Sequence, residues 1–372
     1  MSGKIISLTI EVVRHDLPDD AALDLGLTAR HLDHGILRIV TDDGIEGNCF
    51  VGAFWERAEH QFRPILDVIK PELIGRAAMD REWLWTRCRY LATCLRLTPQ
   101  AWAPVDVALW DLAGKAAGLP VYQLLGAQRR SVPAYVTYAT KYDSPEGFVA
   151  EAEESVALGF RAYKIHPGAL SADDVVAMAG LVRKAVGDDV DLMLDPNCGY
   201  DFRTALKVGF ALDDAGFHWF EDPVPHLDGD AITELSRRLT TPLSMTDQAP
   251  DQFSTTAQFI RHNSVRLPRG SALHLGITGL RKLCSLAEGF GLNCELGLAG
   301  NALLNAANLH VMLSVSNCDY LEYLLPADVE RFALTSYGTP DSSGNMFAPD
   351  VPGLGFELDE DWIAAHRIAS LE

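Results

Sequence analysis

Residues 190–197 read VDLMLDPN, an apolar run that ends in a carboxylate, and similar runs follow at 217–224 (FHWFEDPV) and 243–250 (LSMTDQAP). Each run has the length of a buried strand, and a helix-like or loop segment separates it from the next. The acids at the ends of the runs are Asp195, Glu221 and Asp247, and successive acids are 26 residues apart. That spacing is about one strand plus one helix, so it predicts consecutive parallel strands with an acid at the same end of each.

The same alternation of short strands and helices continues on both sides of this region. The further candidate strands are VPAYVTYA (132–139), AYKIHPG (162–168), SVRLP (264–268), LNCELG (292–297) and NCDYLEYLL (317–325). Eight strands that alternate with helices predict an α/β fold, as a closed parallel barrel rather than an open sheet. Because barrel enzymes place their chemistry at the carboxyl ends of the strands, the three acids mark the candidate site.

The first third of the chain has a different pattern. Its candidate elements are strands at 4–14 and 35–41, an Asp-Gly hairpin turn in TDDGIEG (41–47), and helices at 56–70, 80–96 and 101–117. The tail is rich in Pro and Gly, and we expect it to run back over another part of the fold. The predicted division is an α+β region (1–128), a barrel (129–335) and a C-terminal segment (336–372).

The composition indicates a soluble protein that does not bind nucleic acid. The 372 residues carry a net charge of −20 and the pI is about 4.9, whereas a nucleic-acid surface needs clustered Lys and Arg. No apolar run reaches 18 residues and residues 1–10 alternate like a strand, so we expect neither a membrane span nor a signal peptide. The seven cysteines lack a CxxC pair, which is typical of a reducing compartment. We therefore expect a cytoplasmic location.

The stretch RAYKIHPG (161–168) places Lys164 and His166 two residues apart, so that both side chains point to one face of a strand. The three acids of the following strands would repel one another unless a cation lay between them. Carboxylate oxygens suit a hard ion, Mg²⁺ or alternatively Mn²⁺. Taken singly, each acid fits a helix N-cap or a turn as well. The regular spacing and the basic pair one strand earlier favour a metal site.

Two neighbours of these acids are weaker candidates for the site. Asn197, two residues after Asp195, could hydrogen-bond a substrate or a water molecule, and Asp222 could orient the ligands next to it. Asn and Asp residues in loops more often stabilise turns.

Several motifs resemble the enolase superfamily, in its mandelate racemase and muconate lactonising branch. They are ALWDLAGKAAGLPVYQLLG (108–126), the Lys-x-His pair, DPNCGYD (195–201), WFEDPV (219–224), GITGLRKLCSLAEGFGL (276–292) and PGLGFELD (352–359). The resemblance covers essentially the whole chain. It implies a capping domain, formed by the N-terminal region and the C-terminal tail, over a modified (β/α)₇β barrel.

The resemblance also implies a half-reaction. Members bind Mg²⁺ through three acids, which correspond to Asp195, Glu221 and Asp247, and they remove the proton α to a substrate carboxylate to give an enediolate. The base is usually the second Lys of a Lys-x-Lys pair, and here that position is His166. We expect burial, His166 and Mg²⁺ to lower the pKa of Lys164 toward neutrality, so that either residue could be the base.

The opposite face of the site departs from the family pattern. Racemases of this branch carry a His on the seventh strand and an Asp on the sixth, where this sequence has Gly297 and either Gly270 or Arg269. Lactonising members have a Lys on the sixth strand, near which this sequence has only Leu273 and His274. The candidates for a second acid or base are His274, Arg269 and Glu295, and we predict that His274 and Glu295 contact the substrate.

The resemblance suggests further substrate contacts. Glu322 corresponds to an eighth-strand Glu that bonds a substrate carboxylate oxygen when protonated, although a structural role at the barrel rim is an equal alternative. A capping-domain loop at 16–33, with His31 near its end, is the expected lid. Trp55 could flank the same pocket or belong to the core.

The leading interpretation is a Mg²⁺-dependent lyase that dehydrates a sugar acid or related hydroxy-carboxylate, because one group can take the proton and then protonate the leaving hydroxide on the same face. Racemisation or epimerisation needs groups on two faces and ranks second, while cycloisomerisation stays open. A non-catalytic metal-binding homologue is the alternative from another class. A metallohydrolase barrel would need His ligands, which the three acidic strand ends lack. The expected partner is a small carboxylate substrate, and a homo-oligomer is the expected assembly.

Overall fold

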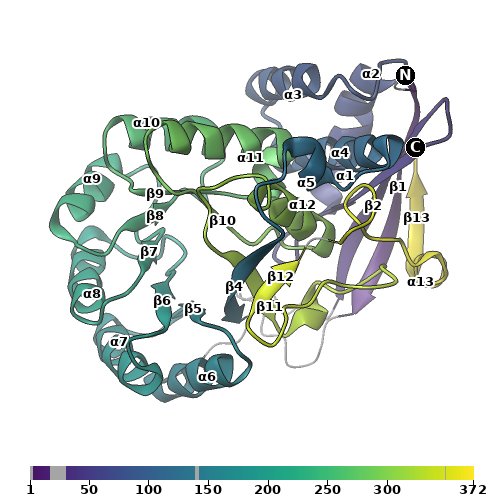
Figure 1. Cartoon of the computed structure of the whole chain (residues 1–372). Helices are drawn as coiled ribbons and strands as arrows, with labels where there is room; N and C mark the ends of the chain where they lie inside the picture. Colours follow the sequence, from purple (N-terminus) through teal and green to yellow (C-terminus); the bar gives the residue numbers. More distant parts are fainter. Residues whose placement is uncertain (1–2, 17–30, 139–141, 348) are drawn as a thin grey trace.

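The computed structural model describes residues 3–16, 31–138, 142–347 and 349–372. Two sheets organise the fold (Figure 1). The smaller sheet has the strand order β13-β1-β2-β3, with β1 (Ile5–Asp16), β2 (His31–Thr41), β3 (Glu46–Val51) and β13 (Arg367–Leu371). The predicted hairpin is confirmed, since β2 and β3 pair antiparallel around the Asp-Gly turn. Both ends of the chain contribute to this sheet, because β13 pairs with β1.

The larger sheet closes into a parallel barrel, and the eight predicted strands are all present in it. They are β4 (Ser131–Tyr138), β5 (Ala162–Ile165), β6 (Asp191–Leu194), β7 (Trp219–Glu221), β8 (Leu243–Met245), β9 (Leu267–Gly270), β10 (Glu295–Leu296) and β11 (Leu321–Leu325). The barrel closes because β11 pairs in parallel with β4. A short strand from the tail, β12 (Asn345–Phe347), pairs antiparallel with the other edge of β4.

An α-helix follows each of the first seven barrel strands, whereas a single 3₁₀ turn follows the eighth, which agrees with the expected (β/α)₇β order. The barrel helices are α6 (Pro145–Ala157), α7 (Ala172–Val186), α8 (Phe202–Asp214), α9 (Gly229–Arg238), α10 (Gln252–Arg261), α11 (Ala272–Gly289) and α12 (Ala302–Met312). The cap contains α1 (Glu59–Pro64), η1 (Ile65–Ile69), α2 (Lys70–Leu73), α3 (Arg81–Leu95), η2 (Pro99–Ala101), α4 (Ala103–Ala117) and α5 (Val121–Leu125). The tail adds η3 (Ala327–Val329) and α13 (Glu360–His366).

Helix α7 shows why these segments form helices around the barrel. The side chain of Ser171 accepts a hydrogen bond from the backbone N–H of Asp174 and so caps the first turn. The buried side chains of the helix, Val175, Met178, Ala179 and Val182, recur at spacings of three and four residues. This apolar stripe packs toward the strands and leaves the charged face to solvent.

A buried contact between α4 and α11 fixes the cap against the barrel. Asp106 accepts hydrogen bonds from the hydroxyl of Thr278 at 2.6 Å and from its backbone N–H at 2.9 Å. Gly276 has a φ of 58° beside this carboxylate, and a Cβ there would collide with Asp106. The residues after β3 have hydrogen bonds of their own to the barrel, from the Phe54 N–H to the Gly300 carbonyl at 3.1 Å and from the Asn301 amide to the Gly52 carbonyl at 2.7 Å. In the described part of the chain, no helix is long and apolar enough to cross a membrane.

Candidate active site

A cavity of about 490 Å³ lies at the carboxyl ends of the barrel strands. Its lining includes Lys164, His166, Asp195, Asn197, Asp247, Gln248 and Glu322, together with Thr137 and Tyr138 of β4. Phe54 and Trp55, which follow β3, come from the cap, and Leu298 and Leu324 come from the barrel. The cavity therefore has a polar floor and an apolar wall.

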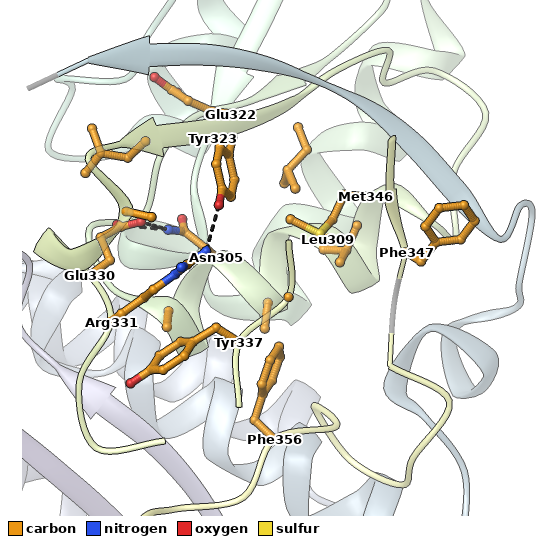
Figure 2. A pocket seen from close by; sticks show the side chains of 16 residues that line it. Asn305, Leu309, Glu322, Tyr323, Glu330, Arg331, Tyr337, Met346, Phe347 and Phe356 are labelled. Atoms are coloured by element: carbon orange, nitrogen blue, oxygen red, sulfur yellow. Dashed lines mark hydrogen bonds between the residues drawn. The ribbon is translucent and has the colours of Figure 1, made fainter. Parts of the chain in front are cut away.

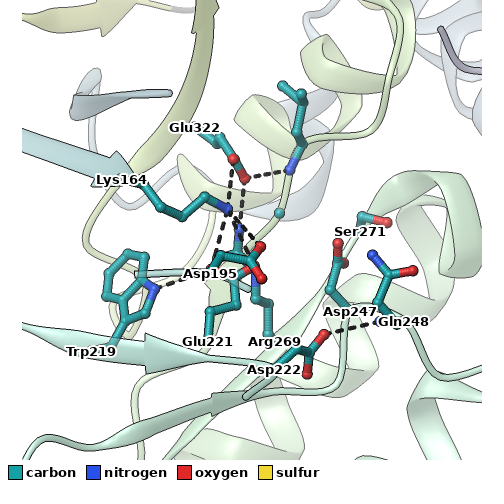
Figure 3. A network of polar contacts seen from close by, with 12 residues as sticks. Lys164, Asp195, Trp219, Glu221, Asp222, Asp247, Gln248, Arg269, Ser271 and Glu322 are labelled. Atoms are coloured by element: carbon teal, nitrogen blue, oxygen red, sulfur yellow. Dashed lines mark hydrogen bonds and ion pairs between the residues drawn. The ribbon is translucent and has the colours of Figure 1, made fainter. Parts of the chain in front are cut away.

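Lys164 lies at the centre of a buried polar network (Figure 3). Its Nζ is 2.7 Å from Glu322 Oε1, 3.2 Å from both carboxylate oxygens of Glu221 and 3.6 Å from Asp195 Oδ2. Burial opposes the charge, but the carboxylates of Glu221 and Glu322 outweigh it and raise the pKa of Lys164 above its ordinary value. We expected burial, His166 and Mg²⁺ to lower this pKa, but the contacts within the protein shift it upward, because acids from distant strands stabilise the charged ammonium.

His166 lies two residues after Lys164, directly beyond the end of β5 and at the edge of the cavity. Its Nδ1 is 3.0 Å from the Thr137 hydroxyl and its Nε2 is 3.3 Å from Asp195 Oδ2. The side chain is 17% exposed, against 3% for Lys164. Both members of the predicted basic pair line the cavity, and His166 is the more exposed of the two.

The three predicted metal ligands follow β6, β7 and β8 or end them, as the sequence spacing predicts. Asp195 and Glu221 share contacts with Lys164, while Asp247 lies further along the barrel rim (Figure 3). Burial and the charges of Glu322 and Asp195 raise the pKa of Asp247 to about 6, although Arg269 and Lys164 oppose the shift. The negative charge at this rim is therefore only partly balanced by the protein's own cations.

The donor chemistry of these residues fits Mg²⁺. The carboxylates of the cluster are Asp195, Glu221, Asp222, Asp247 and Glu322, and all of them are buried except Asp247, which is half-buried. Only two buried cations, Lys164 and Arg269, face them within the described residues, and one oxygen of Asp222 has no hydrogen-bond partner there. An oxygen-only donor set with excess negative charge suits a hard divalent ion. The described acids do not already converge as a group of three ligands, and the carboxylate of Glu221 faces Lys164 and Arg269.

Arg269 is the residue that engages Glu221. Its Nε lies 2.6 Å from Glu221 Oε1, and its Nη2 lies 2.6 Å from Glu322 Oε2 and 2.8 Å from the Tyr135 hydroxyl. Burial raises the pKa of Glu322, but Lys164 and Arg269 lower it more strongly, to about 2. The expectation that Glu322 is protonated is wrong in this state, because two cations hold it ionised.

Asn197 and Trp55 line the cavity as predicted, and Asn197 adopts a φ of 50° with its N–H 2.7 Å from Asp195 Oδ1. His274 does not line it. Its Nδ1 is 3.0 Å from the side-chain amide of Gln252, which bonds the backbone carbonyl of Asp247 at 2.7 Å. His274 therefore supports the rim indirectly instead of contacting the cavity.

Two other predicted substrate residues also lie outside the cavity. The carboxylate of Glu295 accepts hydrogen bonds from the backbone N–H groups of Asp319 and Tyr320 at the start of β11, so it braces the amino-terminal end of the barrel and is not a residue of the site. His31 begins β2 and is exposed. Residues 17–30 of the predicted lid lie outside the described residues.

The sequence predictions missed Thr137 and Tyr135 of β4. These residues lie two apart on one strand face, and they contact His166 and Arg269 respectively. The period of two in VPAYVTYA contained that information, because alternate residues of a barrel strand point inward. Phe54, Leu298 and Leu324 were also missed, since an apolar wall carries no sequence motif.

Two family models match the chain. Residues 9–126 match the mandelate racemase / muconate lactonizing enzyme N-terminal domain, and residues 147–362 match the model described as enolase C-terminal domain-like. The chain belongs to the enolase superfamily. Members of this superfamily bind Mg²⁺, and the family assignment agrees with the barrel and cap of the fold.

Relatives within the superfamily include enzymes of different reaction types. Arabinonate dehydratase of Saccharolobus solfataricus is 30% identical over 82% of each chain. N-succinyl-L-Arg/Lys racemase of Bacillus cereus is 26% identical over 96% of each chain. The crystal structure of D-glucarate dehydratase from Agrobacterium tumefaciens complexed with magnesium is 30% identical, with a TM-score of 0.89 over 99% of this chain and 100% of that one.

Proposed function

We propose that this protein removes the proton α to the carboxylate of a small hydroxy acid and eliminates water from it, most simply as an acid-sugar dehydratase. The observation that carries the proposal is one cavity lined by Lys164, His166 and two of the strand-end acids, Asp195 and Asp247, while the third acid, Glu221, contacts Lys164. Dehydratases among the relatives support the choice of reaction.

Mg²⁺, with Mn²⁺ as the alternative, is the proposed cofactor, and its proposed ligands are Asp195, Glu221 and Asp247. When bound, the ion supplies positive charge next to the substrate carboxylate, where negative charge grows as the α-proton leaves. Asp195 and Asp247 already line the cavity, so both can reach a ligand there.

His166 is the proposed base. Three carboxylates lie within 3.6 Å of Lys164 Nζ and hold its proton, whereas His166 is the more exposed of the pair and lies at the cavity edge. Thr137 orients the ring through Nδ1, which leaves Nε2 as the nitrogen that faces the acids. His166 can take the α-proton and then protonate a hydroxide that leaves from the same face, so one residue serves both steps. Lys164 keeps a positive charge beside the substrate carboxylate.

The other residues that line the cavity have different proposed roles. Asn197 and Gln248 provide amide groups for substrate hydroxyls at the polar floor. Phe54 and Trp55, whose rings meet edge to face at 4.5 Å, form with Leu298 and Leu324 an apolar wall that excludes water from the reacting group.

Racemisation or epimerisation is the second candidate, because a racemase is among the relatives. Such a reaction needs a second acid or base on the opposite face, and the seventh strand offers Gly297 there. Cycloisomerisation would need a similar partner. The expected homo-oligomer and cytoplasmic location remain predictions, and size-exclusion chromatography with light scattering tests the first of them.

A screen of aldonic and aldaric acids tests the proposed function. Purified protein with Mg²⁺ is incubated with each acid, and 2-keto-acid product is measured as its semicarbazone. At least one acid should give keto product, and His166→Asn should abolish it. A library that gives inverted stereochemistry without keto product would establish the isomerase instead. Absence of both product and α-proton exchange would leave only the non-catalytic homologue.

A further inference from the structure

Arg269 lies near the end of β9 and is completely buried. The end of β9 holds its guanidinium against acids from two other strands, Glu221 of β7 and Glu322 of β11. A guanidinium stays charged in proteins. This side of the barrel therefore carries a permanent cation of its own.

Gly297 provides the space for that cation. A Cβ at position 297 would lie 2.9 Å from Asp247 Oδ1 and 3.2 Å from both Nε and Nη2 of Arg269. A His or any other larger side chain at this position would have to occupy the space that the Arg269 guanidinium fills. Arg269 and Gly297 thus form a complementary pair, in which the missing side chain of β10 makes room for the long side chain of β9.

The contacts of Glu221 leave none of its oxygens free. Oε1 faces Arg269 Nε and Lys164 Nζ, and Oε2 faces Lys164 Nζ and the indole N–H of Trp219 at 3.1 Å. Arg269, by contrast, is incompletely satisfied, since neither its Nη1 nor its Nε has a hydrogen-bond partner in the described part of the chain, although Nε lies 2.6 Å from Glu221 Oε1. The arginine is therefore paired with Glu221 by charge rather than by a hydrogen bond, and it retains donors for another arrangement.

We propose that Arg269 is a resident counter-cation that competes with a divalent metal ion for Glu221, and that Gly297 makes this competition possible. In the metal-free protein, Arg269 keeps Glu221 and Glu322 from facing each other unpaired. A metal ion at Asp195, Glu221 and Asp247 binds only as Arg269 releases Glu221, while Nη2 keeps Glu322 and Tyr135. The inference rests on the proposed function, because it assumes that a divalent ion binds to these acids.

The proposed competition predicts a change in metal affinity that can be measured without catalytic activity. Arg269→Met keeps an unbranched side chain of similar length and removes the charge. The metal-free variant should melt at a lower temperature than the wild type, because Glu221 loses a buried partner. It should also bind a divalent ion more tightly, since the ion no longer has to displace a charged group from Glu221.

The test is Mn²⁺ binding to metal-free protein, measured by isothermal titration calorimetry and by electron paramagnetic resonance of the free ion. Arg269→Met should bind Mn²⁺ about tenfold more tightly than the wild type or better, and Mg²⁺ should raise its melting temperature more than it raises that of the wild type. Arg266→Met, an exposed arginine just before β9, is the matched control and should leave the affinity unchanged. Arg269→Lys keeps the charge but cannot contact Glu221 and Glu322 with two separate nitrogens, so it should give an intermediate affinity. This variant replaces Arg269→Met in the test if the Met variant does not fold.

The outcomes separate this inference from the proposed function. If Arg269→Met binds Mn²⁺ no more tightly than the wild type, or more weakly, while both bind it, the competition is refuted and the metal site of the proposed function stands. If neither protein binds Mn²⁺, the metal site itself is refuted, and the inference with it.

Discussion

The two sides of the barrel mouth both carry positive charge, but in different chemical forms. On the β5 side, Lys164 and His166 are groups that can give up or take a proton. On the β9 and β10 side, Arg269 keeps its charge and Gly297 has no side chain. Both sides hold the same acids, because Lys164 and Arg269 each contact Glu221 and Glu322.

Charge balance and proton transfer can therefore be separated in this barrel. Both cations stabilise the buried acids, and the proposed base at the cavity edge, His166, lies on the β5 side. A site with proton transfer on one side favours elimination, in which the proton and the leaving hydroxide depart from one face. The variants that follow test this contrast, in order of decreasing expected effect.

His166→Asn removes the proposed base and should have the largest effect. We expect the rate of α-proton exchange in D₂O to fall by about 10²- to 10⁴-fold, the usual contribution of a general base. Proton nuclear magnetic resonance of the substrate measures the exchange. His218→Asn is the control, because His218 also lies near a carboxylate, 3.8 Å from Asp191, but does not line the cavity. Equal losses in the two variants would contradict a specific role for His166.

Lys164→Met removes the cation of the β5 side and should destabilise the fold. A buried ion pair that loses one partner costs about 3–5 kcal/mol of unfolding free energy, because charges remain buried without balance. Urea denaturation of the metal-free protein measures the loss. Lys207→Met breaks an exposed pair with Asp173 and should cost less than about 1 kcal/mol. If the two variants were equally stable, the network around Lys164 would not hold the acids together.

Glu330 shows what happens to a buried acid that forms no ion pair with the described residues. It lines a second cavity, of about 80 Å³, behind β11, where its carboxylate accepts hydrogen bonds from Asn305 at 2.9 and 2.8 Å (Figure 2). Burial raises the pKa of Glu330 to about 8, although Asn305 opposes the shift. Glu322, paired with two cations, has the opposite shift.

The raised pKa has a definite consequence for stability. The folded state favours the protonated Glu330, so its contribution is complete below the unfolded pKa, near 4.3, and is lost as the pH rises through about 8. Between pH 5 and pH 8 the wild type should lose roughly 1–3 kcal/mol relative to Glu330→Gln, as measured by urea denaturation. Glu357→Gln, at an exposed position, should show no such trend. A parallel pH dependence of wild type and Glu330→Gln would refute the shift.

Gly297→Ala tests the β10 side and should have the smallest effect. The new Cβ would meet Asp247 Oδ1 at 2.9 Å, so we expect a loss of about 1–2 kcal/mol from crowding. Gly180→Ala in α7, where a Cβ meets nothing within 4 Å, should instead stabilise the protein slightly, by about 0.5–1 kcal/mol. A neutral Gly297→Ala would mean that the guanidinium does not fill the space beside position 297.

The fold could be predicted from the sequence because its elements have local patterns. Strand-length apolar runs at regular spacing identified all eight barrel strands, and the Asp-Gly turn identified the hairpin of the cap. The acids at the ends of β6, β7 and β8 followed from the same repeat. These features depend on residues close together in the sequence.

The charge states in the site could not be predicted, because they depend on contacts between distant strands. Lys164 was expected near neutrality, and the sequence contains no sign that Glu221 and Glu322 would both reach its Nζ. Glu295 was assigned to the substrate, but its carboxylate points to the amino-terminal end of β11. Arg269 was one of three candidates for the second acid or base. The structure distinguishes it from the other two by the space that Gly297 leaves beside its guanidinium.

The most direct test of proton transfer from one side only is the stereochemistry of α-proton exchange. A pair of acids that differ only in configuration at the α-carbon, without the β-hydroxyl so that elimination is blocked, is incubated with the protein and Mg²⁺ in D₂O. We predict that only one of the two acids exchanges its α-proton, with retention of configuration, and that His166→Asn abolishes the exchange. Exchange of both acids, or conversion of one into the other, would show a second acid or base on the opposite face and contradict the account.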